Sequence, residues 1–268
     1  MSKRTSDRYH WEKFWTKKKD PGKIYDNSGR IPVALFELTQ DVKDKRVLEV
    51  GAGTGRDSFT IAEEGAKVYV LDYADAALDI VKSLNSQNEE QVIPIQGDAF
   101  ALPFPDNSLD IVFHQGLLEH FRDPWGILRE NYRVLKPGGL AIIDVPQRWH
   151  IYTLVKHILI PLGSWFAGWE TEFSVRQLEK SLRKHGLEPV ALYGDWMYPC
   201  FGYRIFREIC WKLGIHLPLY PPKVPILWRI RRFLREKLRR TRLGANTAVS
   251  IGILAKKVEK TTDNRNTS

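Results

Sequence analysis

The sequence predicts an α/β domain built around a parallel β-sheet, and two observations support this fold class. Between residues 46 and 145, short runs rich in valine, isoleucine and leucine alternate with helical patterns, which is the order expected of βαβ units. The first run leads directly into the glycine-rich turn Gly51-Ala52-Gly53-Thr54-Gly55 and then into a helical pattern. A length of 268 residues suits one such domain with insertions.

Five strands are expected in the first part of the chain, because each is a short apolar run of the kind that strands buried on both faces require. These runs cover residues 46–50, 67–71, 91–96, 109–114 and 140–145. Helices are expected to begin near Arg56, Asp75 and Asp123. Asp123 followed by Pro124 is typical of an N-cap and a first helical residue, and Gly138 and Gly139 are expected to end that helix.

The pattern changes after residue 146. Residues 147–173 are apolar and aromatic and are expected to form an inserted cap rather than another βαβ unit. A helix with Val175, Leu178 and Leu182 on one face follows, with Gly186 as its stop. Two further strands are predicted near residues 187–193 and 247–255, separated by a second aromatic and proline-rich insertion near residues 195–243.

Composition excludes several classes of protein. A hydrophobic fraction of 43% is too high for a disordered chain. The only cysteines, Cys200 and Cys210, fit neither a redox pair nor a zinc site, so no metal is expected. The charged N-terminus lacks the apolar stretch of a signal peptide, which predicts a cytoplasmic protein. A net charge of +9, concentrated in residues 229–242, favours an anionic partner.

The glycine-rich turn indicates a close backbone approach to a ligand, although a tight strand-to-helix turn alone would also use glycine. A dinucleotide fingerprint would place its third glycine at Arg56, whereas here it falls at Gly55. Glu49, two residues before the first glycine, would repel a pyrophosphate but attract a cationic amino-acid group. The turn also lacks the lysine of a P-loop, so NAD and ATP are both disfavoured.

Two further acidic residues follow predicted strands. Asp72 closes the second strand, where a carboxylate can accept from both ribose hydroxyls. Asp98 follows the third strand, beside Ala99 and Phe100, and could accept from the exocyclic amine of an adenine. Each acid alone could equally be a helix cap or turn former. Together with Glu49 they stand at the carboxyl ends of parallel strands, where open α/β sheets bind ligands.

A series of motifs in this order resembles the class I S-adenosylmethionine-dependent methyltransferases. The motifs are VLEVGAGTG, the acidic Asp72, GDAFALPFPDNSLDIVF, GLLEHFRDP and RVLKPGGLAIIDVP. They are especially similar to the ubiquinone and menaquinone biosynthesis C-methyltransferases, with their methyltransferase type 11 domain. The resemblance is strong over residues 44–146 and weak as far as residue 256.

The resemblance implies a Rossmann-like sheet of order 3-2-1-4-5-7-6 with an antiparallel seventh strand, helices on both faces and S-adenosylmethionine as cofactor. We therefore expect an N-terminal lid segment (1–43), a cofactor-binding core (44–146), the cap (147–173), a C-terminal part (174–256) and a flexible tail (257–268). The expected cofactor-binding residues are Glu49, Gly51, Ala52, Gly53, Gly55, Asp72, Tyr73, Asp98, Ala99, His114 and Gln115.

The polar groups expected near the transferred methyl group follow the fourth strand. His120 is our candidate general base, because an unperturbed imidazole titrates near pH 6.5. It could instead cap or orient the loop, and Glu119 and Gln115 could be loop organisers or cofactor contacts. The acceptor is expected to be a small molecule or lipid, contacted by aromatic residues of the N-terminal segment and of residues 149–172. Those N-terminal aromatic residues are Tyr9, Trp11, Trp15 and Tyr25.

Two other functions stay open. The basic charge favours an RNA methyltransferase, but no RNA-binding module is recognisable, and His114-Gln115-Gly116-Leu117 stands where many base-amine methyltransferases have an NPPY-like tetrapeptide. A cofactor-binding protein without catalysis is the other alternative.

Two apolar segments raise the question of whether the chain contacts a membrane. Residues 151–168 are interrupted by Lys156, His157, Pro161 and Gly163, so a buried cap is expected rather than a transmembrane helix. Further along, apolar residues recur at helical spacing with arginines between them, which is typical of a helix on an anionic membrane. A basic face packed on its own domain is the alternative. The apolar residues of this helix, within residues 227–242, are Leu227, Ile230, Phe233, Leu234 and Leu238.

Overall fold

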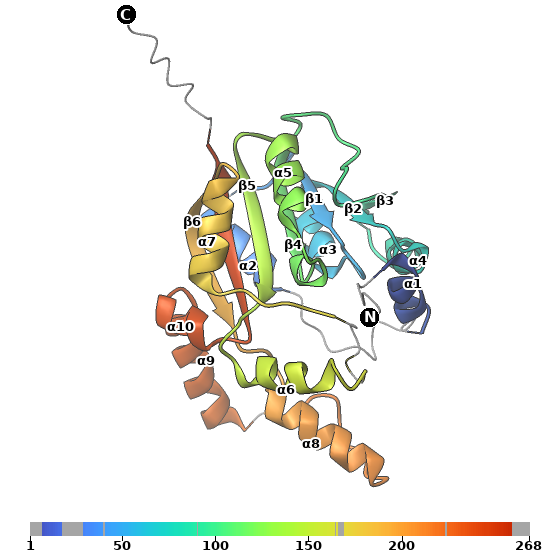
Figure 1. Ribbon diagram of the computed structural model, residues 1–268, viewed down its shortest axis with the longest axis vertical. Helices are drawn as coiled ribbons and strands as arrows, with labels where there is room; N and C mark the ends of the chain where they lie inside the picture. Colours follow the sequence, from blue (N-terminus) through green and yellow to red (C-terminus); the bar gives the residue numbers. More distant parts are fainter. Residues whose placement is uncertain are drawn as a thin grey trace, which may run out of the picture.

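The structure is a computed structural model that describes residues 7–17, 29–39, 41–89, 91–163, 165, 169–222 and 224–258. These residues contain a seven-stranded sheet of order β3-β2-β1-β4-β5-β7-β6 (Figure 1). β7 is antiparallel to both of its neighbours, and the other pairs are parallel. The predicted fold class and strand order are therefore confirmed.

The strands lie close to their predicted positions. They are β1 (Arg46–Val50), β2 (Lys67–Asp72), β3 (Ile93–Gln96), β4 (Leu109–Gln115), β5 (Leu135–Pro146), β6 (Leu187–Asp195) and β7 (Ser250–Lys257). The helices are α1 (Arg8–Lys17), α2 (Arg30–Leu38), α3 (Arg56–Glu63), α4 (Asp75–Asn85), the short η2 (Leu118–His120), α5 (Trp125–Val134), α6 (Ile151–Leu159), α7 (Val175–Lys184), α8 (Phe201–Lys212), α9 (Pro225–Arg239) and α10 (Arg242–Thr247).

Two predicted boundaries are wrong. α5 ends at Val134 rather than at the glycines, and β5 already begins at Leu135. Pro137 explains the early end, because proline lacks an amide N–H and disfavours helix at the residue before it. The last strand, predicted to start near Thr247, begins at Ser250, and Thr247 is instead the last residue of α10. Thr241 caps that helix by accepting from the amide of Gly244 at 3.0 Å.

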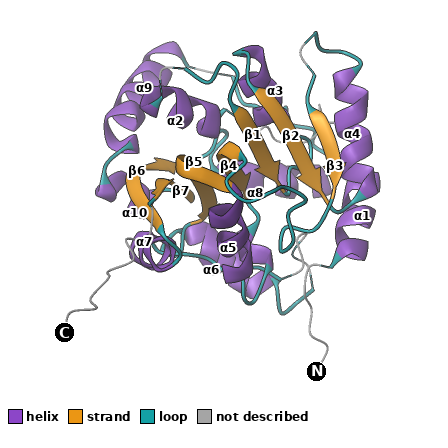
Figure 2. Cartoon of the chain, turned by 90° about the horizontal axis from the view of Figure 1, so that it is seen from above, coloured by secondary structure: helices purple, strands orange, loops and turns teal. Residues whose placement is uncertain are grey.

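Alternate residues of the buried strands point to opposite faces and build two apolar clusters. In β1, Leu48 and Val50 face a cluster that contains residues of α5 and α7, whereas Val47 faces one that contains residues of α2, α3 and α4. Figure 2 shows these helices on the two sides of the sheet. The sheet is thus the middle layer of a three-layer domain, as strands buried on both faces require.

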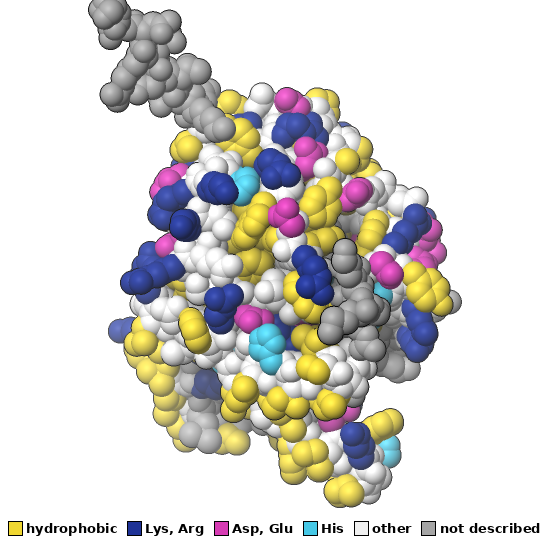
Figure 3. Space-filling view, viewed as in Figure 1, with side chains coloured by type: hydrophobic (Ala, Val, Ile, Leu, Met, Phe, Trp, Pro, Cys, Tyr) yellow, Lys and Arg dark blue, Asp and Glu magenta, His cyan; other side chains and the backbone are white. Residues whose placement is uncertain are grey.

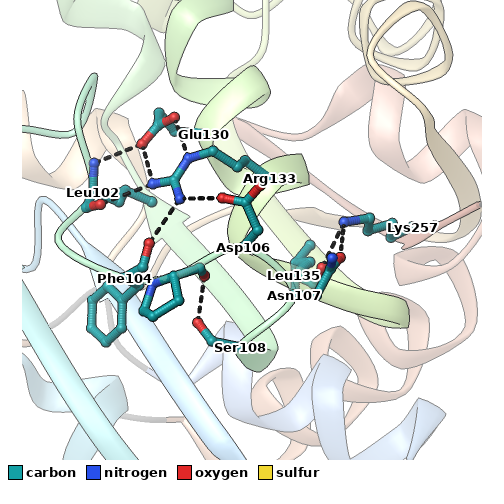
Figure 4. A network of polar contacts seen from close by, with 10 residues as sticks. Leu102, Phe104, Asp106, Asn107, Ser108, Glu130, Arg133, Leu135 and Lys257 are labelled. Atoms are coloured by element: carbon teal, nitrogen blue, oxygen red, sulfur yellow. Dashed lines mark hydrogen bonds and ion pairs between the residues drawn. The ribbon is translucent and has the colours of Figure 1, made fainter.

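The amino end of the sheet is fastened by Arg133 of α5. Its guanidinium donates to Glu130, to Asp106, and to the carbonyl oxygens of Leu102 and Phe104 at 2.7–2.9 Å (Figure 4). The loop that precedes β4 is therefore held to α5 at this end.

The carboxyl end of the sheet is covered by the insertions. Figure 1 shows α6 and α8 beneath the ends of the central strands, with α9 beside them and α1 next to α4. The cap predicted at residues 147–173 thus contains α6, but it is not fully buried, because Trp149 and Leu154 are 72% and 63% exposed. Among the described residues, no helix has both the length and the apolar character needed to cross a membrane.

Candidate active site

The glycine-rich turn leaves β1 with three positive φ angles. Gly51, Gly53 and Gly55 have φ values of 67°, 55° and 63°, a region that L-residues with side chains rarely adopt. Space requires glycine as well, since a Cβ on Gly51 would lie 2.6 Å from the side chain of Leu117, and one on Gly53 would lie 2.5 Å from Trp15 of α1. The turn is therefore packed on both sides by other elements.

Glu49 is buried at the end of β1. It accepts a hydrogen bond of 2.5 Å from the hydroxyl of Ser58 on α3. Burial and, to a smaller extent, the nearby carboxyl groups of Asp57 and Asp72 together raise the pKa of Glu49 to about 8. A cationic group placed between these acids would stabilise their ionised forms.

Asp72 is also buried, at the end of β2. It accepts from the amides of Gly53 at 3.0 Å and of Ala74 at 2.9 Å, so it fastens the glycine-rich turn to the second strand. Burial raises the pKa of Asp72. Each carboxylate oxygen has two acceptor sites, which leaves Asp72 capacity to accept from a ligand hydroxyl as well.

A cavity of about 570 Å³ brings most of the predicted residues together at this edge of the sheet. Of the residues predicted from sequence, its walls include Glu49, Gly51, Ala52, Gly53, Asp72, Tyr73, Gln115 and His120. We call it the main cavity. A second cavity, also of about 570 Å³, contains Asp98 and shares Tyr73 and His120 with the first.

Three predicted residues do not line either cavity. Gly55 is the N-cap of α3, and Ala99 is buried in the apolar cluster on the α5 side of the sheet. His114 is fully buried in β4, and burial lowers its pKa to about 3. Their proposed contact with a cofactor stays a prediction.

His120, the candidate base, lies at the wall where the two cavities meet. Its ring packs edge-on against Trp11 of α1 with 4.7 Å between centroids. Burial lowers the pKa of His120 to about 3, so the imidazole is neutral at physiological pH and much less basic than an exposed histidine.

Sequence reasoning missed a buried charged network at the main cavity. Arg30, at the start of α2, donates to both oxygens of Asp144 on β5 at 2.9 and 2.7 Å, and the hydroxyl of Tyr193 donates to Asp144 at 2.8 Å. Gln115 lies beside Arg30, with its amide oriented to donate to Asp57 at 3.2 Å. No local motif marks Arg30, because its partner is 114 residues away.

The rest of the main cavity is lined by the cap and by α8. Tyr152 of α6 lines it together with Glu119 and Glu170. Burial and the neighbouring Glu170 raise the pKa of Glu119 well above its usual value, and burial also raises that of Glu170. Lys156, fully buried on α6, lies 3.5 Å from Glu170 and donates to the carbonyl oxygen of Thr171 at 3.1 Å, so it holds the cap segment in place.

The N-terminal helix α1 contacts the main cavity both at the glycine-rich turn and at His120. Trp15 packs on Gly53 of the glycine-rich turn, and Trp11 packs on His120. Tyr9, by contrast, is 75% exposed, and Tyr25 lies outside the described residues. No group of three or more metal-ligating side chains is found in the described ranges.

Comparison with known proteins gives relatives that span most of the chain. Residues 48–143 match the family described as the methyltransferase domain. The demethylmenaquinone methyltransferase of Listeria welshimeri is 38% identical over 163 residues, which cover 56% of this chain and 67% of the relative. An uncharacterized methyltransferase of Mycobacteroides abscessus is 29% identical over 209 residues, covering 75% of this chain and 76% of the relative.

Solved structures share the fold. An S-adenosylmethionine-dependent methyltransferase of Thermotoga maritima superposes with a TM-score of 0.62 at 17% identity, covering 94% of this chain and 100% of its own. One of Aquifex aeolicus has a TM-score of 0.54 at 15% identity, covering 92% of this chain and 98% of its own. With its sheet order, its glycine-rich turn and the sequence relatives, the chain belongs to the S-adenosylmethionine-dependent methyltransferases of class I, of the quinone-methyltransferase type.

Proposed function

We propose that this enzyme transfers the methyl group of S-adenosylmethionine to a small, lipid-like acceptor that binds in the part of the main cavity lined by α6 and α8. The observation that carries this proposal is the continuity of that cavity, whose walls include Gly51 and Glu49 of the cofactor turn as well as Tyr152 and Arg204 of the insertions. The Listeria relative is named for a quinone acceptor, which supports an acceptor of this class.

The residues around the turn fit the cofactor. Glu49, Asp57 and Asp72 are buried acids on one wall, and a ligand with positively charged sulfonium and ammonium groups would offset their mutual repulsion. In our proposal Glu49 binds the amino-acid end, Asp72 the ribose hydroxyls, and Asp98 in the second cavity the adenine amine. Bound S-adenosylmethionine supplies a methyl group activated by its positive sulfur.

The protein positions the acceptor and keeps water away. Trp11 and Trp15 of α1 cover the cavity from one side, and Tyr152 covers it from the cap. Positioning of this kind can supply much of the acceleration of a displacement reaction. The raised pKa of Glu119 favours its protonated form, so this carboxyl group can donate a hydrogen bond to an oxygen of the methyl-accepting substrate. Neutral His120 can accept a hydrogen bond from a hydroxyl group of that substrate.

A lipid-like acceptor is also supported by the surface around the insertions. Figure 3 shows apolar side chains along the lower end of the molecule, over α6, α8 and α9. We call these side chains the apolar rim. It contains Ile151, Leu154 and Ile158 of α6, Phe206, Ile209 and Trp211 of α8, and Ile226, Ile230, Phe233 and Leu234 of α9, all more than half exposed. An exposed apolar area of this kind is typical of a contact with membrane or protein.

α9 turns part of its basic face toward the domain and its apolar face outward. Arg231, Arg235 and Arg239 are half-buried on the inner face, whereas Phe233 and Leu234 are exposed. The side chain of Leu227 lies outside the described part of the structure. We therefore propose that the enzyme touches a membrane peripherally through the apolar rim.

Two experiments test the proposed function. Calorimetric titration should show binding of S-adenosylmethionine and of its demethylated product, with at least tenfold weaker binding by Asp72→Asn. A labelled-methyl assay on cell extract separated into lipid, RNA and small-molecule fractions should then place the label in lipid or small molecules. Absence of cofactor binding by folded protein would overturn the whole proposal, and label confined to RNA would overturn the acceptor class.

A further inference from the structure

The inner face of α9 carries a row of arginines. Trp228, Arg231, Arg235 and Arg239 recur at intervals of three and four residues and are the half-buried positions among the described side chains of the helix. Amphipathic helices ordinarily turn their apolar stripe toward the protein, so the inward placement of guanidinium groups is unusual. It needs a physical reason other than packing of apolar surface.

Aromatic rings hold these guanidinium groups in place. Arg235 lies over Trp196 and Arg231 over Tyr198, at 5.8 and 5.9 Å from the ring centroids. Arg232 stacks on Trp228 at 4.8 Å. A guanidinium attracted to a ring through its charge keeps N–H groups that can donate to an anion.

A cavity of about 170 Å³ separates α9 from the end of β6, and its walls include four arginines, 231, 232, 235 and 239. We call it the arginine pocket. The acids among the described residues of its walls are Asp195 and Glu236. Asp195 lies 3.6 Å from Arg30, and Glu236 lies 3.5 Å from Arg232, so both acids already have cationic neighbours.

Arg231 and Arg235 are left without a matched acid. Among the described residues, neither guanidinium has a carboxylate within 4 Å, and Arg235 donates to the carbonyl oxygen of Met197 at 2.9 Å. Burial and the charge of Arg231 lower the pKa of Arg235, and the negative charge of Asp195 offsets this only in part. Two cations one helical turn apart repel one another, and an anion between them would convert that repulsion into attraction.

We propose that the arginine pocket binds a phosphate group through Arg231 and Arg235. Phosphate suits the pocket because guanidinium groups bind its oxygens in bidentate fashion. The phosphate can belong to a phospholipid headgroup or to a free phosphate. The proposal goes beyond the methyl-transfer function, since none of the described residues that line the arginine pocket also lines the main cavity.

The segment between β6 and α8 links the two cavities. Met197 lines the main cavity, and its carbonyl oxygen accepts from Arg235 while its amide donates to Asp195 at 3.0 Å. The residues on either side, Trp196 and Tyr198, line the arginine pocket. A bound phosphate would therefore contact the same loop that forms part of the acceptor side of the main cavity.

The test compares Arg231→Gln/Arg235→Gln with a matched control, Arg229→Gln/Lys237→Gln, which removes two exposed charges of the same helix outside the pocket. Binding is measured without cofactor or acceptor, so the outcome is independent of methyl transfer. The probes are sodium phosphate, followed by calorimetry and thermal midpoint, and sedimenting vesicles of phosphatidylglycerol or of phosphatidylcholine.

We expect the pocket variant to lose at least tenfold in affinity for phosphate, and the control to change less than twofold. If the pocket variant, but not the control, also loses binding to phosphatidylglycerol vesicles, the phosphate belongs to a lipid headgroup. If the two variants differ only in their binding of sodium phosphate, the site takes a free phosphate. Equal losses in both variants would show unspecific attraction to anions and overturn the proposal, as would no binding of either probe by wild-type protein.

A second measurement guards against misfolding of the variant. Because the pocket variant removes the repulsion between Arg231 and Arg235, its thermal midpoint without phosphate should equal or exceed that of wild type. Arg231→Lys/Arg235→Lys keeps the charge but loses the bidentate geometry. Its affinity for phosphate should lie between that of wild type and that of the glutamine variant. A lysine variant indistinguishable from wild type would overturn the bidentate site.

Discussion

Removing Arg30 should destabilise the protein strongly, because this residue neutralises a buried carboxylate. Asp144 is 1% exposed and Arg30 11% exposed, and the two form a bidentate pair of 2.9 and 2.7 Å. In Arg30→Met the aliphatic part of the side chain is kept, but Asp144 retains only the hydroxyl of Tyr193 as a hydrogen-bond donor among the side chains described. The free energy of unfolding is the quantity to measure.

The expected loss is about 3–5 kcal/mol, the range found when one partner of a buried ion pair is deleted. For a protein of this size each kcal/mol lowers the thermal midpoint by about 2–4 °C. The midpoint of Arg30→Met should therefore fall by roughly 10 °C. A suitable control is Arg183→Met, since the Arg183–Glu188 pair is about half exposed on both sides and such pairs contribute less than about 1 kcal/mol.

The loss should also depend on pH. Burial raises the pKa of Asp144, and the charge and hydrogen bonds of Arg30 oppose that rise. Without Arg30 the folded-state pKa rises further, so the folded protein binds a proton more tightly than the unfolded chain does. Stability of the variant is then greatest in acid and falls as the pH rises from the unfolded pKa, near 3.9, through the higher folded value.

Urea unfolding of wild type and both variants at pH 5 and pH 8 tests this reasoning. The difference between wild type and Arg30→Met should be larger at pH 8, and Arg183→Met should differ little from wild type at either pH. A loss below about 1 kcal/mol at both pH values would refute the claim that the network is a buried charge pair.

Three further predictions concern the site. Wild-type affinity for S-adenosylmethionine should fall as the pH drops below about 8, where Glu49 takes up a proton, and calorimetry of Glu49→Gln should show no such dependence; parallel pH curves would remove Glu49 from cofactor binding. His120→Ala should lower turnover more than cofactor affinity. The wild-type rate should show no inflection near pH 6.5, since the pKa of His120 is about 3. Equal turnover in the variant and in wild type would exclude His120 from the mechanism. Gly53→Ala should weaken cofactor binding and lower the free energy of unfolding by about 1 kcal/mol or more, because residue 53 has a φ of 55° and the new Cβ would meet Trp15. If calorimetry and urea unfolding match wild type, the close packing of α1 on the turn is wrong.

The central strands and the glycine-rich turn could be predicted because their signals are local. Val47 and Leu48 are apolar neighbours in a short run, and Gly51 and Gly53 stand where the backbone needs positive φ. The acidic residues at the carboxyl ends of the strands could be predicted from their place at the end of each apolar run. Glu49 and Asp72 lie in one cavity because parallel strands end at the same edge.

Other features depend on contacts that no local pattern reveals. The low pKa of His120 follows from its burial beside Trp11, a residue more than one hundred positions earlier. The sequence of α9 shows an apolar and a basic face, but which face meets the domain depends on Trp196 and Tyr198, which lie against its arginines. Periodicity alone could not choose between the two orientations.

The fastening of α5 by Arg133 has a consequence for protein engineering. Arg133 and the loop it holds (Figure 4) lie at the opposite end of the sheet from the cap, since they precede β4 and β5 rather than follow them. The scaffold is thus anchored at one end and diversified at the other. Libraries that randomise α6 and α8 to change the range of acceptors can leave this anchor untouched.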